Sequence, residues 1–170
     1  MRIIRGSQKG RKIYPPKDFN SRPTTDFAKE SLFNILENIY YFDKLTALDL
    51  FSGTGNISLE FLSRGCERLT SVELNKKNCI HIENQIEELF PIASSDVINS
   101  DVYEFCKHAG LNYKVIFADP PFSDEKIYLL PRLIFNNESV IDTLFILEHS
   151  AKNDFKDSGI SLECCLNICS

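Results

Sequence analysis

The stretch "DLFSGTGNISLEF", residues 49–61, decides the fold of this chain. It begins at the end of the apolar run "TALDLF" (46–51), passes through Gly53-Thr54-Gly55, and continues with a helical pattern from Ile57 to Ser63. Glycines let the backbone turn tightly and approach a ligand, and the helix that follows presents free N–H groups in its first turn. The stretch therefore predicts a buried strand, a ligand-binding turn and a helix.

Strands and helices alternate on both sides of this turn. The pattern predicts strands at 46–51, 68–73, 95–100, 114–119 and 144–150, with helices at 57–63, 76–90, 102–108 and 126–135. Strands joined by helices of this length form right-handed crossovers, and so a mostly parallel sheet with helices on both faces. The predicted fold class is α/β, in a single domain over residues 1–170.

The N-terminal segment predicts two further elements in front of the sheet. "MRIIRGSQKGRKIYPP" (1–16) reads as a β-hairpin that turns around Gly6 to Gly10. "RPTTDFAKESLFNIL" (22–36) opens an amphipathic helix, with Thr24 or Thr25 as its N-cap and apolar residues at helical spacing as far as Ile39. At the other end, alternating apolar residues from Ile160 to Ile168 are consistent with one strand.

Composition narrows the class of protein. The chain has 170 residues, of which 43% are hydrophobic and 25% charged, as in a soluble globular domain. No apolar run approaches the roughly 18 residues of a membrane span, and the N-terminus lacks a secretory apolar stretch. The six cysteines form no C-x-x-C pair, so we expect reduced, structural thiols and no metal site. These features favour a cytoplasmic protein.

Positive charge is concentrated at the N-terminus. Residues 1–22 hold seven basic residues and one acid, a net charge of +6, which leaves −11 on the rest of the chain. Such a basic arm on an acidic body predicts a phosphate-binding face, although a solvated basic terminus explains the charge equally well. The candidate nucleic-acid contacts are Arg2, Arg5, Lys9, Arg11, Lys12 and Arg22.

Acids at two strand ends suggest what the glycine turn binds. Glu73 ends the second predicted strand 20 residues after Gly53, where an acid meets the ribose hydroxyls of a nucleoside in this architecture. Asp101 follows the third strand, where it could bind an adenine amino group while Val102 packs on the ring, or could cap the following helix. The two acids together favour a ribose-bearing cofactor; the glycine pair alone would also fit a nicotinamide dinucleotide or a plain turn.

The stretch "DPPF", Asp119 to Phe122, ends the fourth predicted strand at the same edge of the sheet. Two prolines hold the backbone extended and remove two N–H donors, so the Asp119 carboxylate and the Pro120 carbonyl form an acceptor-only corner. Such a corner suits an –NH₂ group, and Phe122 offers a flat face on which a base can stack. Held there, an amine conjugated to a base can turn its lone pair toward an electrophile.

These residues give the chain a resemblance to a known family. "MRIIRG" with "KGRKI", "RPTTDFAKESLFNIL", "DLFSGTGNISLEFLSRG", "SVELN", "FADPPF" and "LEHS" resemble the bacterial 16S ribosomal RNA guanine-N2 methyltransferases, which have a Rossmann-like fold and use S-adenosylmethionine. The resemblance spans about residues 1–155. It divides the chain into a basic RNA-binding hairpin arm (1–22), a catalytic core (23–155) and an atypical C-terminal tail (156–170), which lacks the basic and aromatic segment usual in the family.

The resemblance also implies roles for residues. The cofactor contacts would be Asp49, Phe51, Gly53, Gly55, Glu73 and Asp101, and the catalytic loop would be Asp119, Pro120, Pro121 and Phe122. Arg22 and Thr24-Thr25 would lie beside the cofactor cleft. The partner would be 16S rRNA or the small ribosomal subunit, bound by a monomer.

Three other functions stay open at this point. Adenine-N6 methyltransferases of DNA share the D-P-P-[FY] turn, but this chain has no 60–100 spare residues for a target-recognition region. A nicotinamide-dependent oxidoreductase is disfavoured because "DPPF" supplies no acid for hydride transfer. A non-catalytic RNA-binding assembly factor could keep the same fold and would bind no S-adenosylmethionine.

Overall fold

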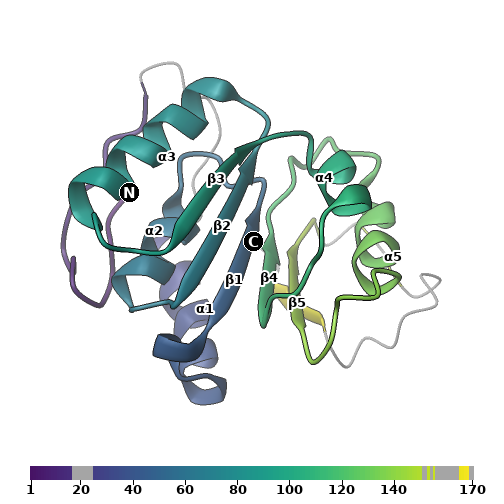
Figure 1. The fold of residues 1–170 in the computed structure, drawn as a ribbon, viewed down its shortest axis with the longest axis horizontal. Coiled ribbons are helices and arrows are strands. Elements are labelled where there is room, and N and C mark those ends of the chain that lie inside the picture. Colours follow the sequence, from purple (N-terminus) through teal and green to yellow (C-terminus); the bar gives the residue numbers. More distant parts are fainter. Residues whose placement is uncertain (17–24, 151–152, 154, 156–164, 169–170) are drawn as a thin grey trace.

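One parallel sheet organises the molecule. The computed structural model describes residues 1–16, 25–150, 153, 155 and 165–168. For residues 165–168 it describes the backbone alone. In this part of the chain six strands form a sheet in the order β3-β2-β1-β4-β5-β6, and every neighbouring pair is parallel (Figure 1). The strands are β1 (Thr46–Leu50), β2 (Arg68–Glu73), β3 (Ser95–Asn99), β4 (Val115–Ala118), β5 (Leu144–Glu148) and β6 (Cys165–Ile168).

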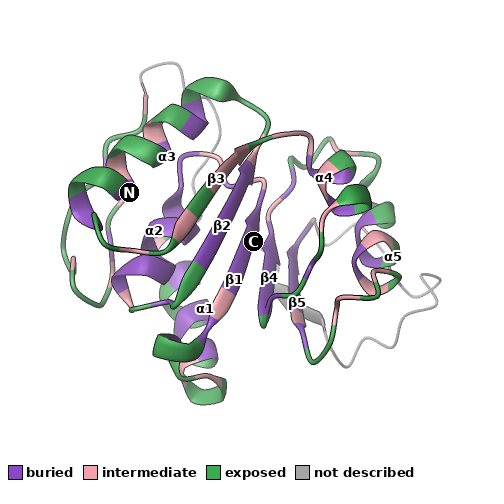
Figure 2. Cartoon of the chain, viewed as in Figure 1, coloured by how far each residue is buried: buried purple, intermediate pink, exposed green. Residues whose placement is uncertain are grey.

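Helices cover both faces of this sheet, as predicted. They are α1 (Asp26–Ile39), α2 (Asn56–Ser63), α3 (Lys76–Leu89), α4 (Val102–His108) and α5 (Leu130–Phe135), with short 3₁₀ turns η1 (Phe42–Lys44) and η2 (Ile127–Leu129). The first three helices share one apolar core with the N-terminal arm, and α4 and α5 share a second core on the opposite face. Strands β1, β2, β4 and β5 are largely buried between these layers, whereas the edge strand β3 is partly exposed, as are the outer helix faces (Figure 2). The predicted Rossmann-like α/β fold is confirmed.

Local sequence explains where α1 begins and why the last predicted helix is shorter than expected. The Thr25 hydroxyl accepts a hydrogen bond from Ala28 N at 3.2 Å, so Thr25 is the cap of α1. The helix predicted over 126–135 is wrong in its first part, because residues 127–129 form a 3₁₀ turn and α5 starts only at Leu130. Pro131 causes this break, since proline lacks the N–H needed inside a helix and fits only its first turn.

The N-terminal hairpin is present but has only one antiparallel bridge, between Arg2 and Lys12. The N–H groups of Ile4 and Arg5 turn away from the opposite arm of the hairpin and donate to the Glu60 carboxylate of α2 instead. Gly6 is required at the turn, because its φ is +86° and a Cβ there would lie 1.7 Å from the Ser63 backbone oxygen. The hairpin is therefore fastened to α2 as well as closed by backbone bonds between its own arms, such as Ile3 N to Arg11 O at 3.0 Å.

The C-terminal strand pairs in parallel with β5, from Phe145 beside Cys165 to Glu148 beside Ile168. The rest of the predicted tail lies outside the described residues. Cys66, Cys79 and Cys106 are buried free thiols, as predicted. Among the described helices, none has the length and apolarity needed to span a bilayer.

Candidate active site

The carboxyl ends of four strands bring the predicted site residues to one edge of the sheet. Leu50 of β1 lies beside Ala118 of β4, and Ala118 lies beside Leu147 of β5. The residues that follow them, among them Asp119 and Glu148, therefore meet at this edge, which we call the carboxyl edge. Ligands of open α/β sheets bind at such an edge, so the topology places the glycine turn and "DPPF" where a shared site can form.

The glycine turn is held in an unusual backbone conformation. Phe51, Gly53 and Gly55 have φ values of +59°, +54° and +79°. A Cβ at Gly55 would come within 3.0 Å of Ile82 Cγ1 of α3, so no other residue fits without a shift. Phe51 is not a glycine, and a left-handed conformation in a bulky residue is strained and is found mostly at functional sites. The turn is thus constrained to keep its backbone close to the edge.

Glu73 joins the second strand to this turn. Its Oε2 accepts a hydrogen bond from Gly53 N at 2.9 Å, and its Oε1 accepts one from Asn75 N at 2.8 Å. The carboxylate thus lies against the glycine turn, as the 20-residue spacing predicts. Its proposed contact with ribose hydroxyls stays a prediction.

Asp49 lies beneath the turn rather than on its surface. It is 1% exposed, and its Oδ2 accepts a hydrogen bond from the Ser58 hydroxyl, which also bonds the Ser71 hydroxyl at 2.8 Å. Burial raises the pKa of Asp49 to about 7, although the Ser58 bond opposes this shift. Asp49 therefore supports the turn from below, and its direct contact with a cofactor stays a prediction.

Asp101 fulfils one of its two predicted roles. Its side chain accepts a hydrogen bond from Glu104 N at 3.0 Å and caps α4. Val102 is buried in the core between α4 and the sheet. The contact of these two residues with an adenine ring stays a prediction.

The "DPPF" loop presents acceptors that no described residue uses. Neither the Asp119 carboxylate nor the Pro120 carbonyl accepts a hydrogen bond within the described residues, whereas Pro121 O accepts one from Asp124 N at 2.8 Å. Pro120 is buried, and Phe122 is 70% exposed. Burial, followed by the negative charges of Glu148 and Asp49, raises the pKa of Asp119 to about 7. The predicted acceptor corner is present.

Sequence reasoning missed two residues that hold this loop. The Tyr103 hydroxyl of α4 donates to Asp124 Oδ2 at 2.7 Å, and Asp124 Oδ1 accepts from Lys126 N at 2.9 Å. The Tyr103 ring also meets the Phe51 ring edge-on, with centroids 6.0 Å apart. Tyr103 therefore ties the "DPPF" loop to the glycine turn. The position of Tyr103 two residues after Asp101 in "SDVYEF" gives no signal of this role.

A groove of about 800 Å³ lies between α4 and α5. Asp101 and Tyr103 are among the residues that line it, and Lys107, Lys126 and Arg132 contribute positive charge. Neither the glycine turn nor "DPPF" lines it. The groove is therefore a neighbour of the acceptor corner and not part of it.

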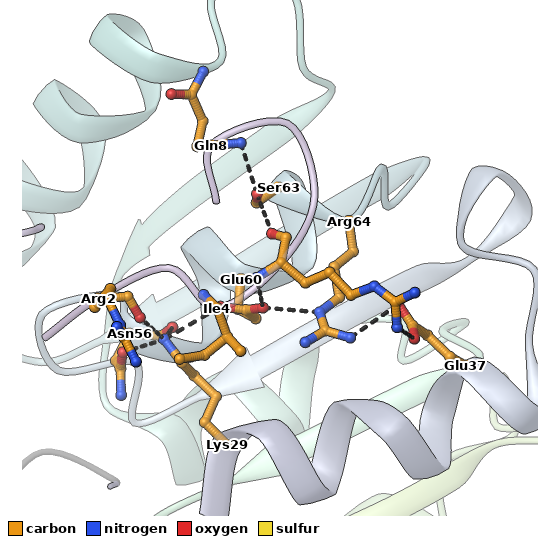
Figure 3. Close-up of polar contacts among 10 residues, drawn as sticks. Arg2, Ile4, Gln8, Lys29, Glu37, Asn56, Glu60, Ser63 and Arg64 are labelled. Atoms are coloured by element: carbon orange, nitrogen blue, oxygen red, sulfur yellow. Dashed lines mark hydrogen bonds and ion pairs between the residues drawn. The ribbon is translucent and has the colours of Figure 1, made fainter. Parts of the chain in front are cut away.

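A buried ion cluster, also missed, anchors the N-terminal arm (Figure 3). Glu60 and Lys29 are 0% and 1% exposed, and Lys29 Nζ lies 3.3 Å from Glu60 Oε2. Arg64 Nε donates to Glu60 Oε1 at 2.8 Å and its guanidinium lies 4.8 Å from the Phe33 ring centroid. Lys29 also donates to Arg2 O at 2.7 Å. The arm is part of the core structure and not a free tail.

The ion pairs divide the basic residues of the arm between two ends of the molecule. Arg2 pairs with Asp26, at the start of α1, near the carboxyl edge. Arg5 pairs with Glu37 and Arg11 with Glu88, close to the ends of α1 and α3, which point away from that edge. Lys9 and Lys12 are exposed, and Arg22 lies outside the described residues.

Comparisons with known proteins agree with this geometry. A family model described as "Conserved hypothetical protein 95" matches residues 1–164. A Bacillus subtilis protein named "Putative rRNA methyltransferase YlbH" is 33% identical over 163 residues, which cover 93% of this chain and 87% of that protein. "Ribosomal RNA small subunit methyltransferase D" of Buchnera aphidicola (subsp. Acyrthosiphon pisum) is 30% identical over 99% of this chain and 93% of its own length. The solved structure titled "Putative methyltransferase yhhF from Escherichia coli" superposes with a TM-score of 0.75 at 29% identity, over 85% of this chain and 77% of that one.

Proposed function

We propose that this chain, which belongs to the family described as conserved hypothetical protein 95, is an rRNA methyltransferase. It transfers a methyl group from S-adenosylmethionine to the exocyclic N2 amine of a guanosine in 16S ribosomal RNA. The relatives named as small-subunit rRNA methyltransferases support the reaction type and the RNA substrate. We further propose that it acts in the cytoplasm, as a monomer, on 16S rRNA or an assembling small ribosomal subunit.

The observation that carries this proposal is the acceptor corner at Asp119 and Pro120. Both acceptors lack partners within the described part of the chain, and both lie at the carboxyl edge beside the glycine turn. Asp119 is half-buried, so its carboxylate and the neighbouring Pro120 carbonyl are available to the donors of a ligand. An exocyclic amine has two N–H donors, one for each acceptor.

The residues of this edge have distinct tasks in the reaction. S-adenosylmethionine supplies, when bound, a methyl group on a positively charged sulfur. Glu73 and the turn at Gly53 and Gly55 would hold its ribose and its chain. Asp119 and Pro120 would hold the amine with its lone pair toward the methyl group and stabilise the positive charge that develops on nitrogen. The carboxylate of Asp119 can then accept the proton that the methylated amine loses.

The product identifies the function directly. Small ribosomal particles from cells that lack this protein should accept label from methyl-labelled S-adenosylmethionine, and nuclease digestion should yield the label as N2-methylguanosine. In a parallel reaction with DNA as substrate, label in N6-methyladenosine, with none in the ribosomal RNA, would support the adenine methyltransferase instead. Failure to bind the cofactor at all would support a non-catalytic assembly factor.

The raised pKa of Asp119 predicts how cofactor affinity depends on pH. Below pH 7 Asp119 is largely protonated and neutral, and above pH 7 its carboxylate attracts the positive sulfur of S-adenosylmethionine. S-adenosylhomocysteine has a neutral sulfur and lacks this attraction. We expect the preference for S-adenosylmethionine over S-adenosylhomocysteine to rise by up to about tenfold from pH 6 to pH 8. Calorimetric titration of both ligands measures the ratio.

The control for this prediction is Asp119→Asn, which cannot ionise and should make the ratio independent of pH. A ratio that is flat in the unmodified protein, or that still rises in the variant, would show that Asp119 is not the titrating group near the sulfur.

The position of the arm predicts which of its lysines touch RNA. Lys12 pairs through its backbone with Arg2, near the carboxyl edge, while Lys9 lies at the hairpin turn beside the far end of α2. We expect Lys12→Gln to reduce the slope of log affinity against log salt by about 0.7–0.9, the value for one lost phosphate contact. Lys9→Gln should leave the slope unchanged, and neither variant should alter cofactor affinity.

Filter binding of 16S rRNA across a salt series measures these slopes. An equal effect of the two lysines would show that RNA also reaches the far end of the hairpin. Single substitutions are required here, because deleting residues 1–22 would remove the buried side chains of Ile3 and Ile13 from the core.

A further inference from the structure

Glu148 is a buried carboxylate with no role in the methyl transfer proposed above. It ends β5 in "LEHS", is 6% exposed, and its Oε2 is fully enclosed without a hydrogen-bond partner among the described residues. Ordinary packing does not explain such a group, because an enclosed carboxylate oxygen without a donor costs free energy. A donor from outside the protein would remove that cost.

Strand register aims this carboxylate at the acceptor corner. Ala118 pairs with Leu147, so Asp119 and Glu148 come next on neighbouring parallel strands. Two residues earlier on each strand, Phe117 and Ile146 both pack into the core beneath α1 to α3, so alternation directs Asp119 and Glu148 to that same face. The negative charge of Glu148 also raises the pKa of Asp119, in line with a short distance between the two carboxyl groups.

The acceptor corner cannot by itself select guanine. Asp119 and Pro120 accept from the N–H groups of any amine attached to a heterocycle, and this includes the N6 amine of adenine. The two bases differ in the ring atom next to the amine, since guanine N1 carries a hydrogen and adenine N1 carries a lone pair. Selection for guanine therefore needs an acceptor beside the corner, at the level of N1.

We propose that Glu148 is the residue that selects guanine, by accepting a hydrogen bond from N1–H through its unpartnered Oε2 while Asp119 and Pro120 hold the N2 amine. This inference rests on the proposed function and adds a specificity residue to the same site. An adenine in this position would set its N1 lone pair against the Glu148 carboxylate, which repels it. Burial raises the pKa of Glu148, and a positively charged sulfur bound at the same edge would lower it again, toward the ionised, accepting form.

A base analogue tests this contact in the unmodified protein. The target guanosine, once located from the labelled product, is replaced in ligated 16S rRNA by 2-aminopurine riboside, which keeps the N2 amine but has no N1–H. A second RNA carries 6-thioguanosine, which keeps N1–H and changes only the 6-position. We expect kcat/KM to fall on the order of 100-fold or more for 2-aminopurine, as when a buried polar group loses its partner, and by far less for 6-thioguanosine.

Variants at Glu148 then assign the discrimination to this side chain. Glu148→Gln can accept from guanine N1–H and can also donate to the N1 of 2-aminopurine, so the preference for guanosine should fall about tenfold or more. Glu148→Asp keeps an accepting carboxylate and should keep the preference at a lower rate. Glu138→Gln removes an exposed glutamate between α5 and β5 and should change neither quantity. Cofactor affinity measured by calorimetry verifies that each variant is folded.

Different outcomes overturn different claims. If the unmodified protein methylates 2-aminopurine as well as guanosine, Glu148 does not select the base, and this result stands even if every Glu148 variant fails to fold. An unchanged preference in folded Glu148→Gln has the same meaning. If natural 16S rRNA receives no label on guanosine N2, the proposed function itself fails.

Discussion

Asp119→Ala should lower kcat by about 10²–10³, because it removes the charged acceptor that orients the amine and stabilises its developing positive charge. The kcat of Asp119→Asn should lie between those of Asp119→Ala and the unmodified protein, because the amide oxygen of asparagine can still accept one N–H but carries no charge. Cofactor affinity at pH 6, where Asp119 is already largely neutral, should change little in either variant. Single-turnover methylation of small ribosomal particles at saturating cofactor measures the rates.

Asp43→Ala is the matched control for this series. Asp43 is exposed in η1, which precedes β1 and so lies at the opposite end of the sheet from the acceptor corner. The methylation rate of Asp43→Ala should equal that of the unmodified protein. An Asp119→Ala variant with an unimpaired rate would remove the acceptor corner from the mechanism.

Glu60→Ala should be the most destabilising single substitution proposed here. It would leave Lys29 Nζ buried without a carboxylate, and the N–H groups of Ile4 and Arg5 without an acceptor. Arg64 would lose its bond to Glu60 but keep the ion pair of its Nη1 with Glu37 Oε1 at 2.9 Å. Removing one partner of a buried ion pair costs about 3–5 kcal/mol in the free energy of unfolding. In a chain of this length that loss lowers Tm by roughly 6–20 °C. Thermal and urea unfolding followed by circular dichroism measure it.

Two further variants test whether the loss of stability comes from the ion cluster itself and not from replacing any helical glutamate by alanine. Glu87→Ala removes an exposed glutamate from α3 and should change stability by less than about 0.5 kcal/mol. Lys29→Met should cost less in the Glu60→Ala background than alone, because Lys29 has then lost its carboxylate partner. Burial lowers the pKa of Lys29 while Glu60 raises it, so the lysine depends on that partner to stay charged. If the losses of unfolding free energy of Glu60→Ala and Lys29→Met simply add in the double variant, the two residues do not stabilise each other.

The order and bounds of most elements could be predicted because each follows from local pattern. The strand "RLTSVE" and the helix Val102–His108 match the structure residue for residue. The error at Lys126 to Leu129 came from reading helical periodicity through Pro131. The hairpin was recognised from its glycine turn, but its attachment to Glu60 could not be, because Glu60 lies 55 residues or more away in the sequence.

The ion cluster left signals in the sequence that local reasoning did not use. Lys29 occupies the buried face of α1 with Leu32, Phe33 and Leu36, and Glu60 stands in a helix whose residues are all buried. A charge on an apolar face requires a partner, so these positions could have been flagged as a buried pair. The pairing itself depends on how α1 packs against α2.

The residues of the site and the edge of the sheet where they lie could be predicted from the sequence, but the hydrogen bonds within the site could not. The spacing of Gly53 and Glu73 and the motif "DPPF" point to the right edge of the sheet. Which acceptors there lack partners depends on tertiary contacts, as the Asp124 bonds to Tyr103 and Pro121 show. For the same reason Glu148 could not be predicted as a site residue from the sequence alone.

The position of the target amine tests the central claim most directly. In a crystal structure with S-adenosylhomocysteine and the target RNA, guanine N2 should lie about 2.7–3.2 Å from both Asp119 Oδ and Pro120 O. The cofactor sulfur should stand on the side of the amine that faces the glycine turn. A guanine whose amine points away from Asp119, or a cofactor bound elsewhere than beside Gly53 and Glu73, would contradict the account.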